Sequence, residues 1–283
     1  MGNLWQPISG VYWKSEPYLP DLNWSVDYWS LFTTIIGALA GAWLGAWAAQ
    51  KIAKTEKKRD EASQEVRSIN AGIILAYNIC NIAMSLKKQH LRNLKKSYDN
   101  DLSIHEAAKK MPPPREIHIK PQMMYLGAPI TPIDELKRIC LDKISSNSLA
   151  IHAAIALSNA INNLNSSIST YNSQIDLFRR AEFPPGFQFE HLYLGIPVNG
   201  SVNNFYGDTL NGLCDYNDDV IFFALVLCDK LQSLGDKIIP DYEKQTGRTD
   251  TKISKIDITD PILDGLVPQH ERYESWLSGF KTK

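Results

Sequence analysis

The apolar residues of the chain form one long uncharged stretch followed by several amphipathic ones. Residues 28–49 read YWSLFTTIIGALAGAWLGAWAA, with no charged side chain among twenty-two positions. At about 1.5 Å per residue, a helix of this length crosses the roughly 30 Å hydrocarbon core of a bilayer. The stretch therefore predicts a single membrane-spanning helix.

A cleaved signal peptide and a buried core helix share part of this pattern. A signal peptide carries basic residues ahead of a shorter apolar stretch, whereas here the basic residues follow it. A buried core helix is usually shorter than this run. We therefore expect an uncleaved anchor.

Three further stretches place apolar residues at alternating steps of three and four, the period of one helix face. The first continues from the span without a proline up to residue 98, and the others run from about 133 to 181 and from about 205 to 239. Such stripes predict an all-α fold: the transmembrane helix continues into a cytoplasmic antiparallel helical bundle with coiled-coil-like seams. The seam positions are Val66, Ile69, Ile73, Ala76, Cys80 and Ala83; Ala154, Leu157, Ile161, Leu164, Ile168, Tyr171, Ile175 and Phe178; and Leu210, Leu213, Asn217, Val220, Ala224, Leu227, Leu231, Leu234 and Ile238.

These elements divide the chain into four parts. Residues 1–27 form an aromatic-rich segment expected outside the cytoplasm, and residues 28–49 form the span. Residues 50–65 form a charged juxtamembrane helix, and residues 66–283 form the bundle domain.

Glycines recur every four residues within the span, at Gly37, Gly41 and Gly45, interleaved with alanines. Small residues at this spacing let two helix backbones approach closely, which is how helices associate in lipid. The repeat predicts self-association of the membrane helix, so a second copy of this chain is an expected partner.

Charge sets the expected orientation. Five basic residues follow the span closely, namely Lys51, Lys54, Lys57, Lys58 and Arg59. Lys and Arg beside a span remain in the cytoplasm, which places the N-terminus outside and the body inside. We expect these residues to contact anionic lipid headgroups. The whole chain has a net charge of −1, so no direct nucleic-acid partner is expected.

Two proline-rich connections, residues 111–132 and 183–204, exceed the usual loop length. They contain similar pentapeptides, YLGAP at 125–129 and YLGIP at 193–197, through either duplication or chance. The second connection predicts a partner- or ligand-binding loop that carries Phe187, Phe189, His191 and Tyr193. A short amphipathic helix is expected from 269 to 280.

Candidate chemistry is sparse. The histidines show no zinc-binding spacing, and no phosphate-binding or nucleophile motif occurs. Asp215, Asp218 and Asp219 are close enough in sequence to hold a cation, but acidic residues are also favoured in the first turns of a helix, which we prefer. We expect no enzymatic activity, cofactor or metal.

Two polar groups of residues carry structural expectations. The four cysteines, Cys80, Cys140, Cys214 and Cys228, form no CxxC pair, so buried reduced thiols are expected. The asparagines flanking the second seam, Asn159, Asn162, Asn163, Asn165 and Asn172, are expected to be solvated, with hydrogen bonding to neighbouring helices or to a small polar ligand as the alternative.

Together these patterns predict a bacterial-type single-pass inner-membrane protein that self-associates and couples an intracellular signal or partner to the membrane. A membrane-perturbing effector, of the kind used in phage defence, fits this architecture. The alternatives are a non-catalytic scaffold subunit of a larger membrane complex and a ligand-sensing module. Expected partners are the lipid bilayer, a second copy and a cytoplasmic protein.

Overall fold

The computed structural model describes residues 28–113, 117–144 and 148–279, and every regular element in these ranges is helical. The prediction of an all-α fold is thereby confirmed for the described part of the chain. The predicted outer segment, residues 1–27, lies outside the described residues.

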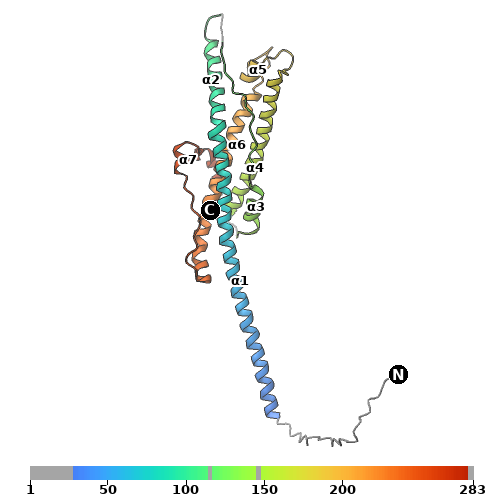
Figure 1. Ribbon diagram of the computed structural model, residues 1–283, viewed down its shortest axis with the longest axis vertical. Helices are drawn as coiled ribbons and strands as arrows, with labels where there is room; N and C mark the ends of the chain where they lie inside the picture. Colours follow the sequence, from blue (N-terminus) through green and yellow to red (C-terminus); the bar gives the residue numbers. More distant parts are fainter. Residues whose placement is uncertain (1–27, 114–116, 145–147, 280–283) are drawn as a thin grey trace, which may run out of the picture. The chain divides into compact units, whose positions relative to one another are not determined.

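One helical path runs through the first third of the chain. It consists of α1 (Tyr28–Leu86), the single π-helical turn η1 (Lys87–Leu91) and α2 (Arg92–Lys109), as Figure 1 shows. The predicted continuation of the apolar helix to residue 98 is correct, and the helix extends further. The chain divides into two compact units whose boundary lies within α1, Met1–Glu56 and Lys57–Lys283.

The second unit contains the remaining helices. They are α3 (Ile133–Asp142), α4 (Ser148–Arg180), α5 (Phe189–Leu194), α6 (Phe205–Thr246), α7 (Thr259–Leu263), the 3-10 turn η2 (His270–Tyr273) and α8 (Glu274–Ser278). Helices α4 and α6 run side by side in opposite directions (Figure 1). The start of α6 meets the end of α4, where the Gln174 side chain donates to the Phe205 carbonyl at 3.3 Å.

The interior of this unit is built from the predicted apolar stripes. All six seam positions of α1, from Val66 to Ala83, are buried. On α4 the seam is buried from Ala154 to Ile175, and on α6 from Leu210 to Leu231. Helices α1 and α6 also approach closely, since the Cys228 thiol lies 3.7 Å from the Ile73 carbonyl oxygen. Removal of these apolar faces from water is the main stabilising term for such a unit.

The single helix expected from 133 to 181 is wrong, because α3 ends at Asp142 and α4 begins at Ser148. The sequence between them, from 143 to 147, reads KISSN, and serine and asparagine compete with the helix by bonding to nearby backbone groups. Residues 145–147 themselves lie outside the described ranges.

The two C-terminal helices also differ from expectation. Helix α6 continues past residue 239, through Pro240, to Thr246, and is capped by Gly247 in the left-handed conformation (φ 70°). A proline inside a helix loses one hydrogen bond, but burial of Tyr242 (3 % exposed) favours the extra turns. The helix expected from 269 to 280 is instead the short η2 followed by α8.

Two asparagine side chains hold extended segments against the helices. Asn172 on α4 bonds to both main-chain groups of Leu126, accepting from its N–H at 2.9 Å and donating to its carbonyl at 2.8 Å. Asn70 on α1 accepts from the N–H of Ser254 at 2.8 Å and donates to the carbonyl of Lys252 at 3.0 Å. Asn172 is therefore not simply solvated, and its partner is an extended segment where the alternative expected a helix or a small ligand.

Residues 248–279, here called the C-terminal strap, pass over α1 and α6. Ile253 of the strap packs against Gly235 of α6, where an added Cβ would lie 2.6 Å from its Cδ1 atom. Further along, the Tyr273 ring stacks on Phe222 with ring centroids 3.7 Å apart. The strap thus covers part of the apolar surface of α6.

The two similar pentapeptides adopt different roles. Leu126 of the first lies in an extended segment held by Asn172, whereas Tyr193 and Leu194 of the second end α5. Gly195 of the second then caps this helix with φ 69°. Their different conformations favour chance similarity over duplication.

Candidate functional site

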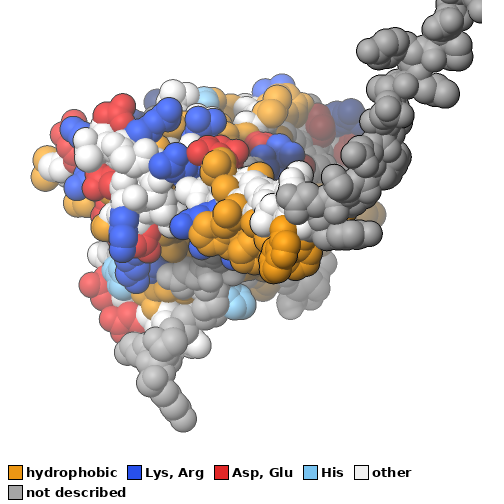
Figure 2. Space-filling model, turned by 90° about the horizontal axis from the view of Figure 1, so that it is seen from below, with side chains coloured by type: hydrophobic (Ala, Val, Ile, Leu, Met, Phe, Trp, Pro, Cys, Tyr) orange, Lys and Arg blue, Asp and Glu red, His pale blue; other side chains and the backbone are white. Residues whose placement is uncertain are grey.

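The first segment of α1 has an uncovered apolar surface. The helical path from 29 to 109 is long and apolar enough to cross a membrane, and its most apolar eighteen-residue window is 0 % buried. Trp43, for example, is 69 % exposed. Figure 2 is seen from the N-terminal end of α1 and shows hydrophobic side chains gathered there. Soluble monomers seldom leave such a continuous apolar surface in water, so this segment needs lipid or a partner to cover it.

Gly37, Gly41 and Gly45 lie in this uncovered segment. Apart from the adjoining backbone of α1 itself, an added Cβ at any of the three would meet no described atom within 4 Å. The backbone at these positions is therefore accessible to a second helix. A larger side chain there would clash with no other part of the described chain.

The five basic residues predicted to contact headgroups are all exposed. Lys51 lies over the Trp47 ring, with its ammonium nitrogen 5.1 Å from the centroid. Arg59 instead donates from Nε to the Gln245 carbonyl at 2.7 Å, and Lys57 lies 3.8 Å from Glu61. Arg59 thus contacts its own domain, while the first two lysines, Lys51 and Lys54, belong to the first unit.

The predicted binding loop contains a helix. Phe189, His191 and Tyr193 lie on α5, with Phe187 just before it. Tyr193 is only 1 % exposed, and Phe189 stacks on it with centroids 5.2 Å apart. The Nδ1 atom of His191 accepts from the Gln188 N–H at 3.0 Å, which caps the helix. In this conformation Phe189 packs on Tyr193, whose side chain faces the interior, and His191 caps α5.

Tyr193 belongs to a buried cluster of tyrosines that joins α2, α4, α5 and α6. Its hydroxyl donates to the carboxylate of Asp101, itself 2 % exposed, at 3.0 Å. The Tyr206 ring contacts Tyr193, Tyr98 and Tyr171, with centroids 4.9 to 6.0 Å apart. Burial raises the pKa of Tyr193 and Tyr206 well above the ordinary value, so both hydroxyls stay protonated. The cluster is a packing core with one satisfied carboxylate.

The three aspartates of α6 contact the strap and the π-turn. The expectation that they occupy the first turns of a helix is wrong, because α6 begins ten residues earlier, at Phe205. Asp215 accepts from Arg272 at 2.6 Å, Asp218 accepts from Lys87 at 2.6 Å, and Asp219 accepts from the Tyr273 hydroxyl at 2.8 Å. Burial raises the pKa of Asp219. All three carboxylates are therefore engaged by protein donors.

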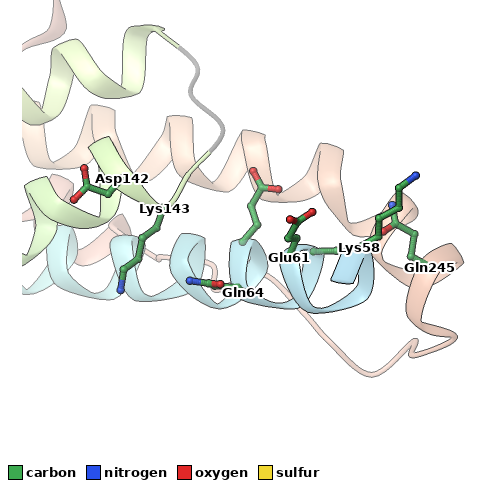
Figure 3. A pocket seen from close by; sticks show the side chains of 8 residues that line it. Lys58, Glu61, Gln64, Asp142, Lys143 and Gln245 are labelled. Atoms are coloured by element: carbon green, nitrogen blue, oxygen red, sulfur yellow. The ribbon is translucent and has the colours of Figure 1, made fainter. Parts of the chain in front are cut away.

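No group of three or more His, Cys, Asp or Glu side chains in the described ranges is placed to hold a metal. A polar cleft of about 520 Å³ opens at the start of the second unit (Figure 3). It is lined by side chains of both charges, among them Lys58, Glu61, Gln64, Asp142, Lys143 and Gln245. Because both acids and bases line it, the cleft favours no single class of ligand.

The π-turn is a feature that sequence reasoning missed. The buried positions step from Leu86 to Leu91, five residues apart, which is the spacing of one i to i+5 turn. This five-residue spacing of Leu86 and Leu91 is the one feature of the sequence that could have indicated the π-turn. Turns of this type occur frequently at functional sites, and this one places Lys87, Lys88 and Arg92 against the strap.

Comparisons with protein-family models, with curated proteins and with solved structures found no match to this chain. The functional argument accordingly depends on the residues described above.

Proposed function

We propose that this chain is a single-pass membrane protein without catalytic activity, whose helical body couples an intracellular signal to the bilayer. The observation that carries this proposal is the uncovered apolar segment of α1, whose most apolar window is 0 % buried. A span needs about 20 apolar residues, and this segment supplies them.

The proposed orientation has the N-terminus outside and the body in the cytoplasm, with the span in a bacterial inner membrane. Support comes from the exposed lysines Lys51 and Lys54, which directly follow the apolar segment. Basic residues at such positions are retained on the cytoplasmic side. Lys51 over Trp47 is a typical arrangement for a membrane–water interface, where both side chains are favourable.

The proposed assembly uses the glycine face. Gly37, Gly41 and Gly45 leave the helix backbone open, with no described atom within 4 Å of an added Cβ apart from the adjoining backbone of α1 itself. Helices in lipid associate by close packing of such small residues. A second copy of α1 is therefore the proposed partner of this face.

A test of the anchor separates membrane insertion from peripheral binding. The full chain, expressed in a bacterial cell with an epitope at its N-terminus, should remain in the membrane pellet after an alkaline carbonate wash. Protease added to spheroplasts should remove the epitope and leave the body intact. Release by carbonate, or digestion of the body, would contradict the proposed anchor or its orientation.

A test of the effector role uses overproduction. Wild-type chain should depolarise the cell membrane, and Gly41→Leu should abolish this effect, because a larger side chain blocks close helix packing. Ala46→Leu, about 140° around the helix from Gly41, is the matched control and should behave as wild type. Unchanged membrane potential with the wild-type chain would favour a scaffold role instead.

A further inference from the structure

A second cleft, here called the basic cleft, lies between the π-turn with α2 on one side and α6 on the other. Its volume is about 430 Å³. It is lined by four cations, two carboxylates and two apolar or weakly polar side chains: Lys87, Arg92, Lys95 and Lys96; Asp99 and Asp218; Leu91 and Cys214. A volume of this size lies within the range of about 300–1,000 Å³ that small-molecule sites occupy.

The π-turn brings the cations onto one face. The Arg92 N–H bonds to the Lys87 carbonyl, five residues back, so Arg92 lies one turn above Lys87. In an uninterrupted α-helix, residues five apart point about 140° away from each other. The extra residue in this turn therefore aligns Lys87 with Arg92, and Lys95 and Lys96 follow one turn later.

The cations that line the cleft outnumber its carboxylates. Lys87 is paired with Asp218 at 2.6 Å, and Lys95 is paired with Asp99. Arg92 donates from Nη2 to the main-chain oxygen of Asp264 at 2.6 Å, so this bond uses no carboxylate.

Lys96 is exposed and has no ion pair with any of the described residues. Two cations in a partly enclosed cleft thus have no carboxylate bonded to them.

Two of the donors are already held in position. Lys87 donates to the Leu266 carbonyl at 3.0 Å as well as to Asp218, and its side chain is only 17 % exposed. Arg92 is held by the strap in the same way. A ligand that binds here meets ordered donors, which lowers the entropic cost of binding.

We propose that the basic cleft binds a soluble, phosphate-bearing small molecule of nucleotide size. Arg presents a fork of N–H donors that matches phosphate oxygens, and Lys supplies point charges. Leu91 and Cys214 provide the apolar contact that the non-phosphate part of such a ligand needs. The site does not depend on the proposed membrane role, since every residue that lines it belongs to the second unit.

The test uses the full chain in nanodiscs of neutral phosphatidylcholine and measures binding of ATP and of pyrophosphate by titration calorimetry. Both probes should bind, ATP more tightly because it also contacts the apolar wall. The double variant Arg92→Gln/Lys96→Gln should weaken ATP binding by about tenfold or more. Lys96→Gln alone, which removes no contact of the fold, should weaken it by about threefold.

Two further variants distinguish specific binding in the basic cleft from a general electrostatic attraction of the protein for anions. Lys109→Gln, on the same helix and outside the cleft, should leave the affinity for ATP within about twofold of wild type. Asp99→Asn releases Lys95 from its carboxylate and should strengthen ATP binding by about threefold. A variant that merely damaged the fold would weaken binding, so tighter binding is specific to the cleft.

Several results would overturn the proposal. Absence of heat with both probes at millimolar concentration would do so, as would equal weakening by Lys109→Gln and Lys96→Gln. A lipid headgroup carries the same phosphate chemistry, so the titration is repeated in nanodiscs that contain phosphatidylglycerol. If anionic lipid stabilised the chain and soluble ATP did not bind, the assignment to a soluble ligand would be wrong.

Discussion

At the residue scale, the glycines of α6 show how closely one helix packs against its neighbours. An added Cβ at Gly207 would overlap the hydroxyl of Tyr98, so the Tyr98 ring occupies the space that a side chain would need. At Gly212, five residues later, the nearest atom is a ring carbon of Tyr216 at 3.8 Å, an ordinary contact. Of these two glycines, Gly207 is therefore the one that packing requires.

Gly207→Ala should lower the free energy of unfolding by about 2 kcal/mol, because Tyr98 must leave its place among the other tyrosines. Gly212→Ala should be neutral or raise it by up to about 1 kcal/mol, since alanine favours the helix. Denaturant unfolding of both variants measures this difference. Equal effects would contradict the close contact of Tyr98 with α6.

The cysteines give a second prediction at this scale. The four thiols are free, and burial raises the pKa of Cys80 to about 12 and the pKa of Cys140 and Cys214 to about 11. At pH 8 a thiol with a pKa near 11 is about one part in a thousand thiolate, the reactive form. All four should therefore react slowly with a disulfide reagent in the folded chain and rapidly in denaturant.

Cys214, the half-buried cysteine in the basic cleft, should be the first to react. Mass spectrometry of the labelled peptides gives the order. Rapid labelling of Cys80 before Cys214 would contradict the packing of α1 on α6.

At the element scale, side chains hold two segments that have no regular structure of their own. Asn172 pairs with Leu126, and Asn70 pairs with Lys252 and Ser254. Each asparagine replaces the main-chain partner that a neighbouring strand would supply, which satisfies polar groups on otherwise unpaired backbone. The strap is fixed further by Gln232, which donates to the Ser254 carbonyl at 3.0 Å.

Asn70→Ala should lower the free energy of unfolding by about 1–3 kcal/mol, because it leaves two main-chain groups of the strap without their partner. Hydrogen exchange at the Ser254 amide should become faster. Asn159→Ala, at an exposed position on α4, is the control and should change neither quantity. Unchanged exchange at Ser254 in Asn70→Ala would show that the strap is held by other contacts.

The elements differ in how far their sequence predicts them. The stripes from Val66 to Ala83 and from Ala154 to Ile175 are buried as their three-four spacing predicts, because each covers one face of a regular helix. The strap could not be predicted, since its partners lie some 180 residues away and main-chain bonds carry no residue pattern. The break after Asp142 was missed because apolar residues continue on both sides of the serines.

The candidate sites likewise differ in how far the sequence predicts them. The glycine face and the basic residues of the proposed anchor are local patterns and can be recognised in the sequence. The basic cleft combines Lys87 and Arg92, which an α-helical reading places on different faces, with Cys214 from α6. Its recognition requires both the π-turn and the packing of two distant helices.

At the scale of the whole molecule, the two units have different surfaces. The second unit buries its apolar stripes within itself, whereas the described apolar residues of the first are uncovered, as Leu39 at 65 % exposure illustrates. Within the described residues of one chain, one large apolar surface is therefore left without a partner. We assign this surface to lipid and its glycine face to a second copy of the chain.

The most direct test is the mass of the detergent-extracted protein by light scattering, with wild type, Gly41→Leu and Ala46→Leu measured side by side. We expect a discrete multiple of the 31.9 kDa chain for wild type and Ala46→Leu. We predict a single chain for Gly41→Leu, because an added side chain there meets no described atom outside its own helix and would block a neighbouring helix. A single chain in all three, or the same oligomer in all three, would contradict assembly through the glycine face.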